Sequence, residues 1–584
     1  MAATAKVEVR KGLSGYFSAS QGRVDRWRSV HRLAKALAAG SSASEALRNE
    51  ALEELNSLAP LEELCAYPGP ALMATLKERL QTRDWTAFAR LAQRISISLL
   101  SNSYRDDPEA WKADEEGEAH TPEVLPPGIA RGQARKPYFE VLVVTPGERS
   151  TWEATRESLR RLRRDSDSFI YEPVVVGSFE DAALAAIVNY NINAVVIFDG
   201  FGYPSQHAVP DLREILAAHV PAAPSTDADL GTTLARVLNA YRPELDLYLA
   251  TDRDVGALAG SDEAACIRRV FYGVEEMLEI HLSILDGIAE RYATPFFDNL
   301  KKYAQRPIGT FHALPVARGK SVFKSHWIRD FGYFYGTNIF LAESSATTGG
   351  LDSLLEPTGN IKIAQEKAAR CFGAQKLFFA TNGTSTSNKI AVQAIVRPGD
   401  IVLVDRNCHK SHHYGLVLGG GQPLYVEAYP LMQYSMYGGV PLRTIKQTLL
   451  DLKAEGKLDR VRMLLLTNCT FDGHIYNVPR FMEEVLAIKP DIVFLWDEAW
   501  YAYSRFSPFH RRRSAMGACE ALRERYANPA YRAEHAAFKK KYGNLDPKNP
   551  KLLDTHLLPD PDAVKLRVYA TTSTHKSLSC FRQG

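Results

Sequence analysis

Near its C-terminal end the chain reads Leu566-Arg567-Val568-Tyr569-Ala570-Thr571-Thr572-Ser573-Thr574-His575-Lys576-Ser577-Leu578-Ser579. The apolar first part predicts a buried strand, and the polar second part places Lys576 just past that strand, among hydroxyls and beside His575. Desolvation and nearby positive charge favour the neutral, nucleophilic form of a lysine amine, and hydroxyls bind anionic groups. The stretch therefore indicates imine chemistry at Lys576, with a merely solvated lysine as the alternative.

A second polar loop, residues 380–388, lies between a predicted strand (376–379) and a predicted helix (389–396). Glycine lets the backbone approach an anion, and N–H groups at the start of a helix point towards it. The Gly-Lys-Thr of a nucleoside-triphosphate loop is absent, so the loop favours a small monophosphate. An ordinary capped start of a helix is the alternative interpretation.

The predicted strand 401–404 is followed by a run rich in imidazoles. It places His409 just beyond the carboxyl end of the strand, where open α/β sheets build their sites. Zinc is an alternative, with Cys408, His409, His412 and His413 as ligands, but four ligands within six residues do not readily close a tetrahedron. We therefore expect a site without a metal.

The predicted strand 492–496, which comes after the predicted strand 462–467, is followed by Asp497. A carboxylate at the mouth of a buried strand is costly unless it meets a cation or a protonated ring nitrogen. Asp497 is therefore a candidate site residue, with a helix cap as the alternative.

The N-terminal half predicts a different organisation. Residues 1–104 form a helical region, 105–137 an acidic, proline-rich linker, and 138–255 a small parallel sheet of flavodoxin or receiver type. Its strands are predicted at 138–144, 173–176 and 194–198. Residues 256–310 form a helical connector, with helices at 267–289 and 295–303, before the main domain at 311–584. Acids are missing after the first strand of the sheet, which favours a structural or assembly role over a phosphorylation switch.

Composition narrows the class of protein. A net charge of +3 over 584 residues, with 45% hydrophobic and 24% charged residues, gives no reason to expect nucleic acid or a membrane as partner. The seven cysteines are scattered and form no CxxC pair, which favours a reducing compartment. No signal sequence and no run of 18 apolar residues is visible, so we expect a cytoplasmic protein.

Taken in order, the phosphate loop, His409, Asp497 and the Ser-Thr-His-Lys motif resemble the large domain of fold-type I pyridoxal-phosphate enzymes. More closely, the chain resembles the bacterial ornithine/lysine/arginine decarboxylases. The motifs that carry this resemblance are residues 381–386, 405–411, 472–473, 497–500 and 573–576, and it is dense from about Thr294 onward. The resemblance implies an α/β fold with an aspartate aminotransferase-like large domain, preceded by a receiver-like wing domain and the N-terminal helical region.

The resemblance also implies roles for individual residues. Lys576 would bind pyridoxal 5'-phosphate covalently, Asp497 would keep the pyridine nitrogen protonated, and His409 would stack on the ring. His575 would lie beside the reacting carbon, and the remaining cofactor contacts would come from Gly383, Thr384, Ser385, Trp500 and Ser573. The implied substrate is a basic amino acid, arginine, lysine or ornithine, and the implied assembly is a homodimer or a higher oligomer.

Two departures from the family pattern leave alternatives open. The charged stretch 515–560 is longer than expected, which predicts a surface insertion, and only eight residues follow Lys576, which predicts that part of the large domain and a C-terminal domain are missing. Another fold-type I reaction, such as transamination, is one alternative. A non-catalytic chain that docks on a full-length decarboxylase is the other.

Overall fold

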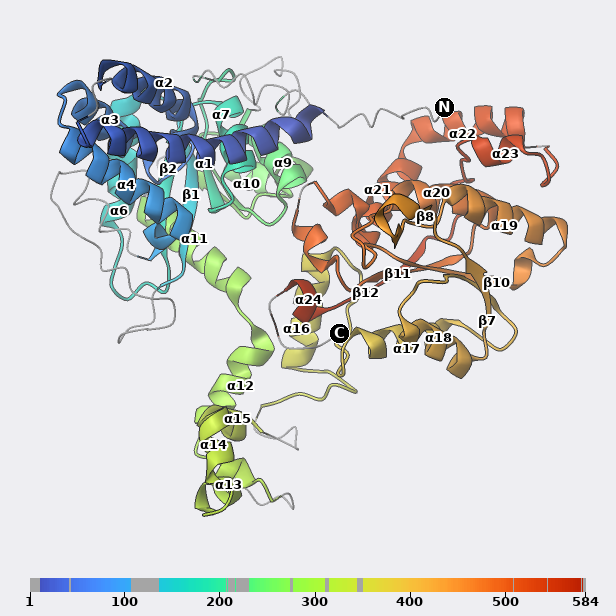
Figure 1. The fold of residues 1–584 in the computed structure, drawn as a ribbon. Helices are drawn as coiled ribbons and strands as arrows, with labels where there is room; N and C mark the ends of the chain where they lie inside the picture. Colours follow the sequence, from blue (N-terminus) through green and yellow to red (C-terminus); the bar gives the residue numbers. More distant parts are fainter. Residues whose placement is uncertain are drawn as a thin grey trace. The chain divides into compact units, whose positions relative to one another are not determined.

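The structure is a computed structural model that describes residues 11–40, 44–106, 136–205, 207, 216, 230–273, 277–309, 315–343, 350–507, 509–543, 545–578 and 580. The chain divides into two compact units, Met1–Ala293 and Thr294–Gly584 (Figure 1). The predicted linker lies almost entirely outside the described residues, and so does Ser579. The finer division into five regions stays a prediction.

The N-terminal unit begins with a bundle of helices. They are α1 (Lys11–Ala38), α2 (Ser44–Glu62), α3 (Gly69–Gln81) and α4 (Trp85–Ser101), followed by the 3-10 turn η1 (Ser103–Arg105). Each helix contributes a large buried side chain to one apolar core, as Trp27, Leu55, Leu76 and Phe88 show. This burial supplies most of the stability of helices of such length.

A parallel sheet forms the rest of this unit, in the order β2-β1-β3-β4-β5. Its strands are β1 (Tyr138–Val144), β2 (Ile170–Val176), β3 (Ile192–Phe198), β4 (Asp246–Thr251) and β5 (Arg269–Tyr272). Its helices are α6 (Arg149–Arg161), α7 (Phe179–Val188), α9 (Leu230–Tyr241), α10 (Val255–Ala259) and α11 (Met277–Tyr292). Leu142 faces a core with α7 and α9, whereas Val141 faces a core with α6 and α11, as expected for strands covered on both faces.

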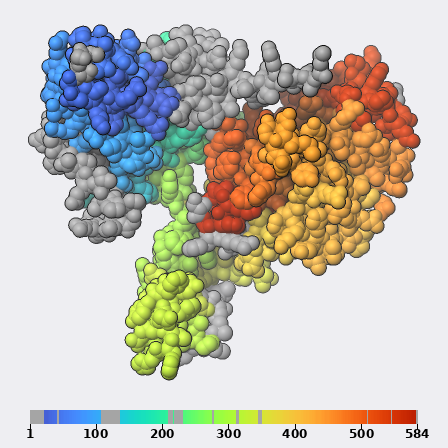
Figure 2. Space-filling model, viewed as in Figure 1, coloured from blue at the N-terminus to red at the C-terminus, as the bar shows by residue number. Residues whose placement is uncertain are grey.

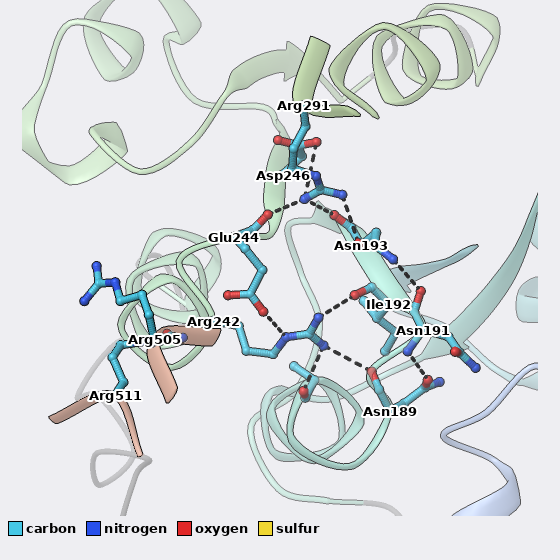
Figure 3. Close-up of polar contacts among 11 residues, drawn as sticks. Asn189, Asn191, Ile192, Asn193, Arg242, Glu244, Asp246, Arg291, Arg505 and Arg511 are labelled. Carbon is cyan, nitrogen blue, oxygen red and sulfur yellow. Dashed lines mark hydrogen bonds and ion pairs between the residues drawn. The ribbon is translucent and has the colours of Figure 1, made fainter. Parts of the chain in front are cut away.

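Arg242 closes the C-terminal end of α7. Its Nη1 donates to the carbonyls of Ala186 and Asn189, and its Nη2 donates to the carbonyl of Ile192 at 2.8 Å (Figure 3). Because the last carbonyls of a helix have no partner within it, a buried guanidinium is an effective replacement. It fixes the turn between α7 and β3.

The C-terminal unit contains the second parallel sheet, in the order β12-β11-β10-β6-β7. Its strands are β6 (Ile401–Asp405), β7 (Gln422–Val426), β10 (Val461–Thr467), β11 (Val493–Glu498) and β12 (Arg567–Thr572), with β8 (Pro430–Leu431) and β9 (Met436–Tyr437) as a separate hairpin. The helices before the sheet are α12 (Pro295–Gln305), α13 (Lys320–Lys324), α14 (Arg329–Tyr335), α15 (Thr337–Ala342) and α16 (Asn360–Phe372). The later helices are α17 (Thr384–Ile395), α18 (Lys410–Gly419), α19 (Leu442–Ala454), α20 (Val478–Ile488), α21 (Ala515–Ala527), α22 (Pro529–Tyr542), α23 (Lys551–Asp554) and α24 (Thr574–Ser577).

Helices cover both faces of this sheet as well. Helices α17 and α18 pack on one face through Val392 and Leu416, and α19, α20 and α21 pack on the other, with Val485 at their centre. The unit is thus a three-layer α/β domain whose parallel strands all end at one edge, as expected for the large domain of a fold-type I enzyme.

Three predicted elements are wrong or differ in extent. The region predicted as one helix, 267–289, contains the strand β5 and most of the helix α11. Strand β5 forms because its backbone pairs with that of β4. Residues 376–379, predicted as a strand, pair with no other strand in the described part of the chain. Strand β2 begins at Ile170 and contains Pro173, which an edge strand tolerates because one side of it needs no hydrogen bonds.

None of the helices in the described parts of the chain is long and apolar enough to cross a membrane.

Candidate active site

The predicted site residues come from segments that lie at or follow the carboxyl ends of three parallel strands. Asp497 is the last residue but one of β11, His409 follows β6, and Lys576 is in the short helix α24 after β12. Since β11 pairs with β12 in parallel register up to Glu498 and Thr572, the Asp497 and Lys576 segments leave the sheet at the same edge.

Asp497 is the most enclosed of these residues, with 3% of its surface exposed. Its Oδ2 accepts hydrogen bonds from His412 Nε2 at 2.8 Å and from Asn388 Nδ2 at 3.1 Å, and its Oδ1 accepts from the Ala499 N–H at 3.1 Å. Burial alone would raise the pKa of this carboxyl, but the hydrogen bond and charge of His412, with the other donors, leave the pKa below its ordinary value. Asp497 is therefore held as a carboxylate.

His409 forms the N-cap of α18. Its Nδ1 accepts from the Ser411 N–H at 3.2 Å and lies 2.8 Å from the Ser411 hydroxyl. Burial lowers the pKa of His409, and the charges of His412, Lys576 and Lys410 lower it further, against an opposing effect of the Asp497 carboxylate. The neutral form of the ring is thus favoured.

Lys576 lies against an aromatic ring. Its Nζ is 4.4 Å from the centre of the Trp500 ring, which fixes the amine by a cation–π contact when it is charged. Three residues before it, the fully buried Ser573 hydroxyl lies 3.0 Å from Nδ1 of the exposed His575. Trp500 itself is 41% exposed, so the amine and the indole line an accessible part of the site.

The predicted phosphate loop is joined to the strand that carries the lysine. Helix α17 starts at Thr384, five residues earlier than predicted, and the Thr384 hydroxyl donates to the Thr572 carbonyl at 2.9 Å. Gly383 precedes the helix with φ of +79°, a conformation that favours glycine, and no side chain caps the first turn. Ser385 follows in that turn, so the first N–H groups of α17 are available to an anion.

Sequence reasoning missed two residues of this network, His412 and Asn388. Both are buried and meet at Asp497, and Asn388 also donates to the Ser411 hydroxyl at 3.0 Å. The sequence did contain a signal for these two residues. A buried carboxylate needs hydrogen-bond donors, and His412 and Asn388 both lie in polar stretches beside the candidate site residues. The earlier start of α17 puts Asn388 one helical turn after Thr384, on the same face.

The side chains named for the zinc alternative have other partners in the structure. His412 is committed to Asp497, while Cys408 Sγ lies 3.5 Å from His413 Nε2 and has a pKa raised to about 12, chiefly by burial. Across the described ranges, no three His, Cys, Asp or Glu side chains are grouped so that they could hold a metal ion.

Comparison with known proteins identifies relatives of the chain. Residues 294–540 match the family model described as "Orn/Lys/Arg decarboxylase, major domain". Lysine decarboxylase LdcA of Pseudomonas aeruginosa is 31% identical over 297 residues, covering 49% of this chain and 39% of the relative. The constitutive ornithine decarboxylase of Escherichia coli is 32% identical over 299 residues, covering 50% and 40%. The biodegradative arginine decarboxylase of Escherichia coli is 28% identical over 369 residues, covering 60% and 47%.

The chain spans less than half the length of each of these relatives. Among solved structures, lysine decarboxylase A from Pseudomonas aeruginosa covers 65% of this chain and 49% of its own, at 25% identity and a TM-score of 0.37.

Proposed function

We propose that the chain decarboxylates a basic amino acid, arginine, lysine or ornithine, with pyridoxal 5'-phosphate as cofactor, because residues 294–540 match the Orn/Lys/Arg decarboxylase family model. The observation that carries the proposal is the buried Asp497 carboxylate, held by His412 and Asn388 at the sheet edge from which the Lys576 segment also leaves. A carboxylate and a lysine amine in this relation suit a ring that carries a basic nitrogen at one end and a carbonyl carbon at the other.

Buried polar atoms in the same region test whether the residues fit this cofactor. Asn388 Oδ1, Thr571 Oγ1, Ser387 Oγ and Ser577 Oγ are buried and have no hydrogen-bond partner among the described residues. Unpaired buried polar atoms are costly, and two of these four, Ser387 Oγ and Asn388 Oδ1, belong to the first half of α17. The three hydroxyls can donate to the phosphate oxygens of such a ligand, and the amide oxygen of Asn388 can accept from a donor on it, so the residues present fit the group.

Each residue then has a defined task. Gly383, Thr384, Ser385 and Ser573 would hold the phosphate, Asp497 would hold the protonated ring nitrogen, and Lys576 would hold the carbonyl carbon. His409 and Trp500 would bound the faces of the ring. When bound, pyridoxal phosphate supplies the ring that accepts the electron pair left behind as CO2 departs.

The protein's own contribution is orientation and proton delivery. The site must hold the bond to the α-carboxylate perpendicular to the ring, and it must return a proton to the α-carbon afterwards. Lys576 and His575 are the two groups of the α24 segment that can carry this proton. The hydrogen bond between Ser573 and His575 Nδ1 leaves Nε2 of the imidazole as the atom that exchanges it.

We further propose that the chain acts as a homodimer. The segment around α14 exposes large aromatic side chains, with Trp327 93%, Phe334 83% and Tyr333 72% exposed. Figure 2 shows this segment in yellow-green. Several large exposed aromatic side chains in one short segment are typical of an interface rather than of a free surface.

The test is CO2 release from arginine, lysine and ornithine in turn, with the cofactor-loaded chain. Release from one of the three, lost in Lys576→Ala, supports the proposal. Cofactor bound through Lys576 without release of CO2 from any of them would contradict the decarboxylase assignment and favour transamination, which pyruvate or 2-oxoglutarate as amino acceptor would then reveal.

A further inference from the structure

The N-terminal unit contains a cavity of about 240 Å³ between its helical bundle and its sheet. Its lining comes from α1, the turn between α2 and α3, α4, η1, β1 and the segment between α7 and β3. It contains none of the residues of the candidate active site. A ligand bound there would therefore be a function beyond the proposed decarboxylation.

The walls of this cavity are fixed before any ligand arrives. The rings of Tyr67 and Tyr104 stack with their centres 5.0 Å apart, and Asn191 Nδ2 donates to the Tyr104 hydroxyl at 2.8 Å. Asn189, which also lines the cavity, is held through its carbonyl by Arg242 (Figure 3). A preformed cavity loses little conformational entropy on binding.

Two guanidinium groups of the lining have unused donors. Glu62 accepts from Arg23 Nε and Nη2, which leaves Arg23 Nη1 without an acceptor in the described part of the chain. Arg105 donates from Nε to the Tyr104 hydroxyl, and neither of its Nη groups meets an acceptor among the described residues. A third guanidinium, that of Arg28, has one ion pair among the described residues, with Asp25 at 3.5 Å. These groups suit a carboxylate or a phosphate.

The one buried carboxylate of the lining, Glu140, has no acceptor position left for a ligand. Glu140 is 1% exposed, and its two oxygens accept from four donors: the Ala66 N–H, Asn189 Nδ2, Asn191 Nδ2 and the Tyr138 hydroxyl, at 2.7 to 3.1 Å. All acceptor positions of this carboxylate are thus occupied. The cavity therefore offers unused donors but no unused carboxylate, which disfavours a cationic ligand.

Size and wall chemistry narrow the ligand further. The volume of about 240 Å³ lies below the roughly 300 to 1,000 Å³ of pockets for drug-sized ligands, which favours a small ligand over a dinucleotide. The remaining lining combines aromatic rings with Val24, Leu99 and Val188, which suits a flat apolar body. We propose that this cavity binds a small planar organic anion, an aromatic or heteroaromatic carboxylate, with its charge on Arg23 and Arg105 and its ring against the tyrosines.

Isothermal titration of the full chain with matched probes tests the proposal. Indole-3-carboxylate is expected to bind with a Kd on the order of 0.1 to 1 mM. Three further probes each lack one property of this ligand. Indole-3-carboxamide lacks the negative charge, cyclohexanecarboxylate lacks the planar ring, and inorganic phosphate lacks the apolar ring system. Each is expected to bind at least about tenfold more weakly, the cost of losing one good polar or stacking contact.

Variants locate the binding in the cavity. Arg105→Gln should weaken indole-3-carboxylate about tenfold, and Val24→Trp, which fills the cavity from an exposed position of α1, should abolish binding. Arg90→Gln, on the exposed face of α4 and outside the lining, is the control and should bind as the wild type does. Circular dichroism confirms that each variant is folded. Equal binding of the carboxamide, no binding of the carboxylate, or an unchanged Kd in both cavity variants would overturn the proposal.

Discussion

Replacing His412 with leucine should expose how the fold keeps Asp497 ionised. His412 is fully buried, and it supplies the shortest of the three hydrogen bonds to that carboxylate, at 2.8 Å. Removing a donor to a buried charged group costs about 1.5 to 3 kcal/mol. Leucine has a similar volume, so little cavity cost adds to this value. We expect the free energy of unfolding of the C-terminal sheet to fall by about 2 kcal/mol near neutral pH, which is the value for the lost hydrogen bond alone.

The loss should depend on pH in a defined direction. The pKa of Asp497 lies below its ordinary value in the folded chain, so its charge stabilises the fold above that ordinary value, and the stabilisation is lost as pH falls through the lowered pKa. Without His412, burial dominates and the pKa rises, so the ionised carboxylate opposes folding at pH 7.5. At pH 4.5 the variant can bind a proton, and its deficit should shrink.

Amide hydrogen exchange of peptides from β11 and α18, corrected for intrinsic rates at each pH, measures this locally. Exchange should be about 30-fold faster than in the wild type at pH 7.5, which is the 2 kcal/mol converted at 1.36 kcal/mol per tenfold. The matched control is His413→Leu, which removes the neighbouring half-buried imidazole without touching Asp497. Equal acceleration at both pH values, or the same effect in the control, would refute the reasoning.

Three further outcomes are expected. Lys576→Ala should abolish borohydride-stable labelling by pyridoxal phosphate, whereas Lys410→Ala should not; a mapped label on another lysine would remove Lys576 from its role. Asp497→Asn should retain part of the cofactor but lose nearly all turnover, since an amide cannot hold the ring nitrogen protonated, and near-normal turnover would exclude Asp497. The buried Glu498 has a pKa raised from 4.5 to about 7, so its charge opposes folding as pH rises through that window. Glu498→Gln should therefore match the wild-type melting temperature at pH 4.5 and exceed it at pH 8, by an amount on the order of 3 kcal/mol in stability; equal melting at both would contradict this.

Sequence patterns predicted the elements whose signal is local. The strands β6, β10, β11 and β12 were placed within one or two residues, because continuous apolar runs bounded by polar turns are typical of buried parallel strands. Strand β5 was taken for the start of a helix, since Arg269–Tyr272 has only four residues and acquires its character from pairing with β4.

The pattern along the strand β11 marks Asp497 as a residue of interest, but it does not say which donors meet it. Those donors come from α17 and α18, residues 109 and 85 positions away in the chain, and their approach depends on where each helix starts. Moving the start of α17 from residue 389 to Thr384 converts Asn388 from a loop residue into one that points with Thr384 towards the end of β12 and β11. The position of one helix start therefore decides whether Asp497 is a solvated cap or an enclosed carboxylate with fixed lone pairs. In the enclosed form these donors hold the pKa of Asp497 below its ordinary value despite burial, which suits the proposed partner of a protonated ring nitrogen.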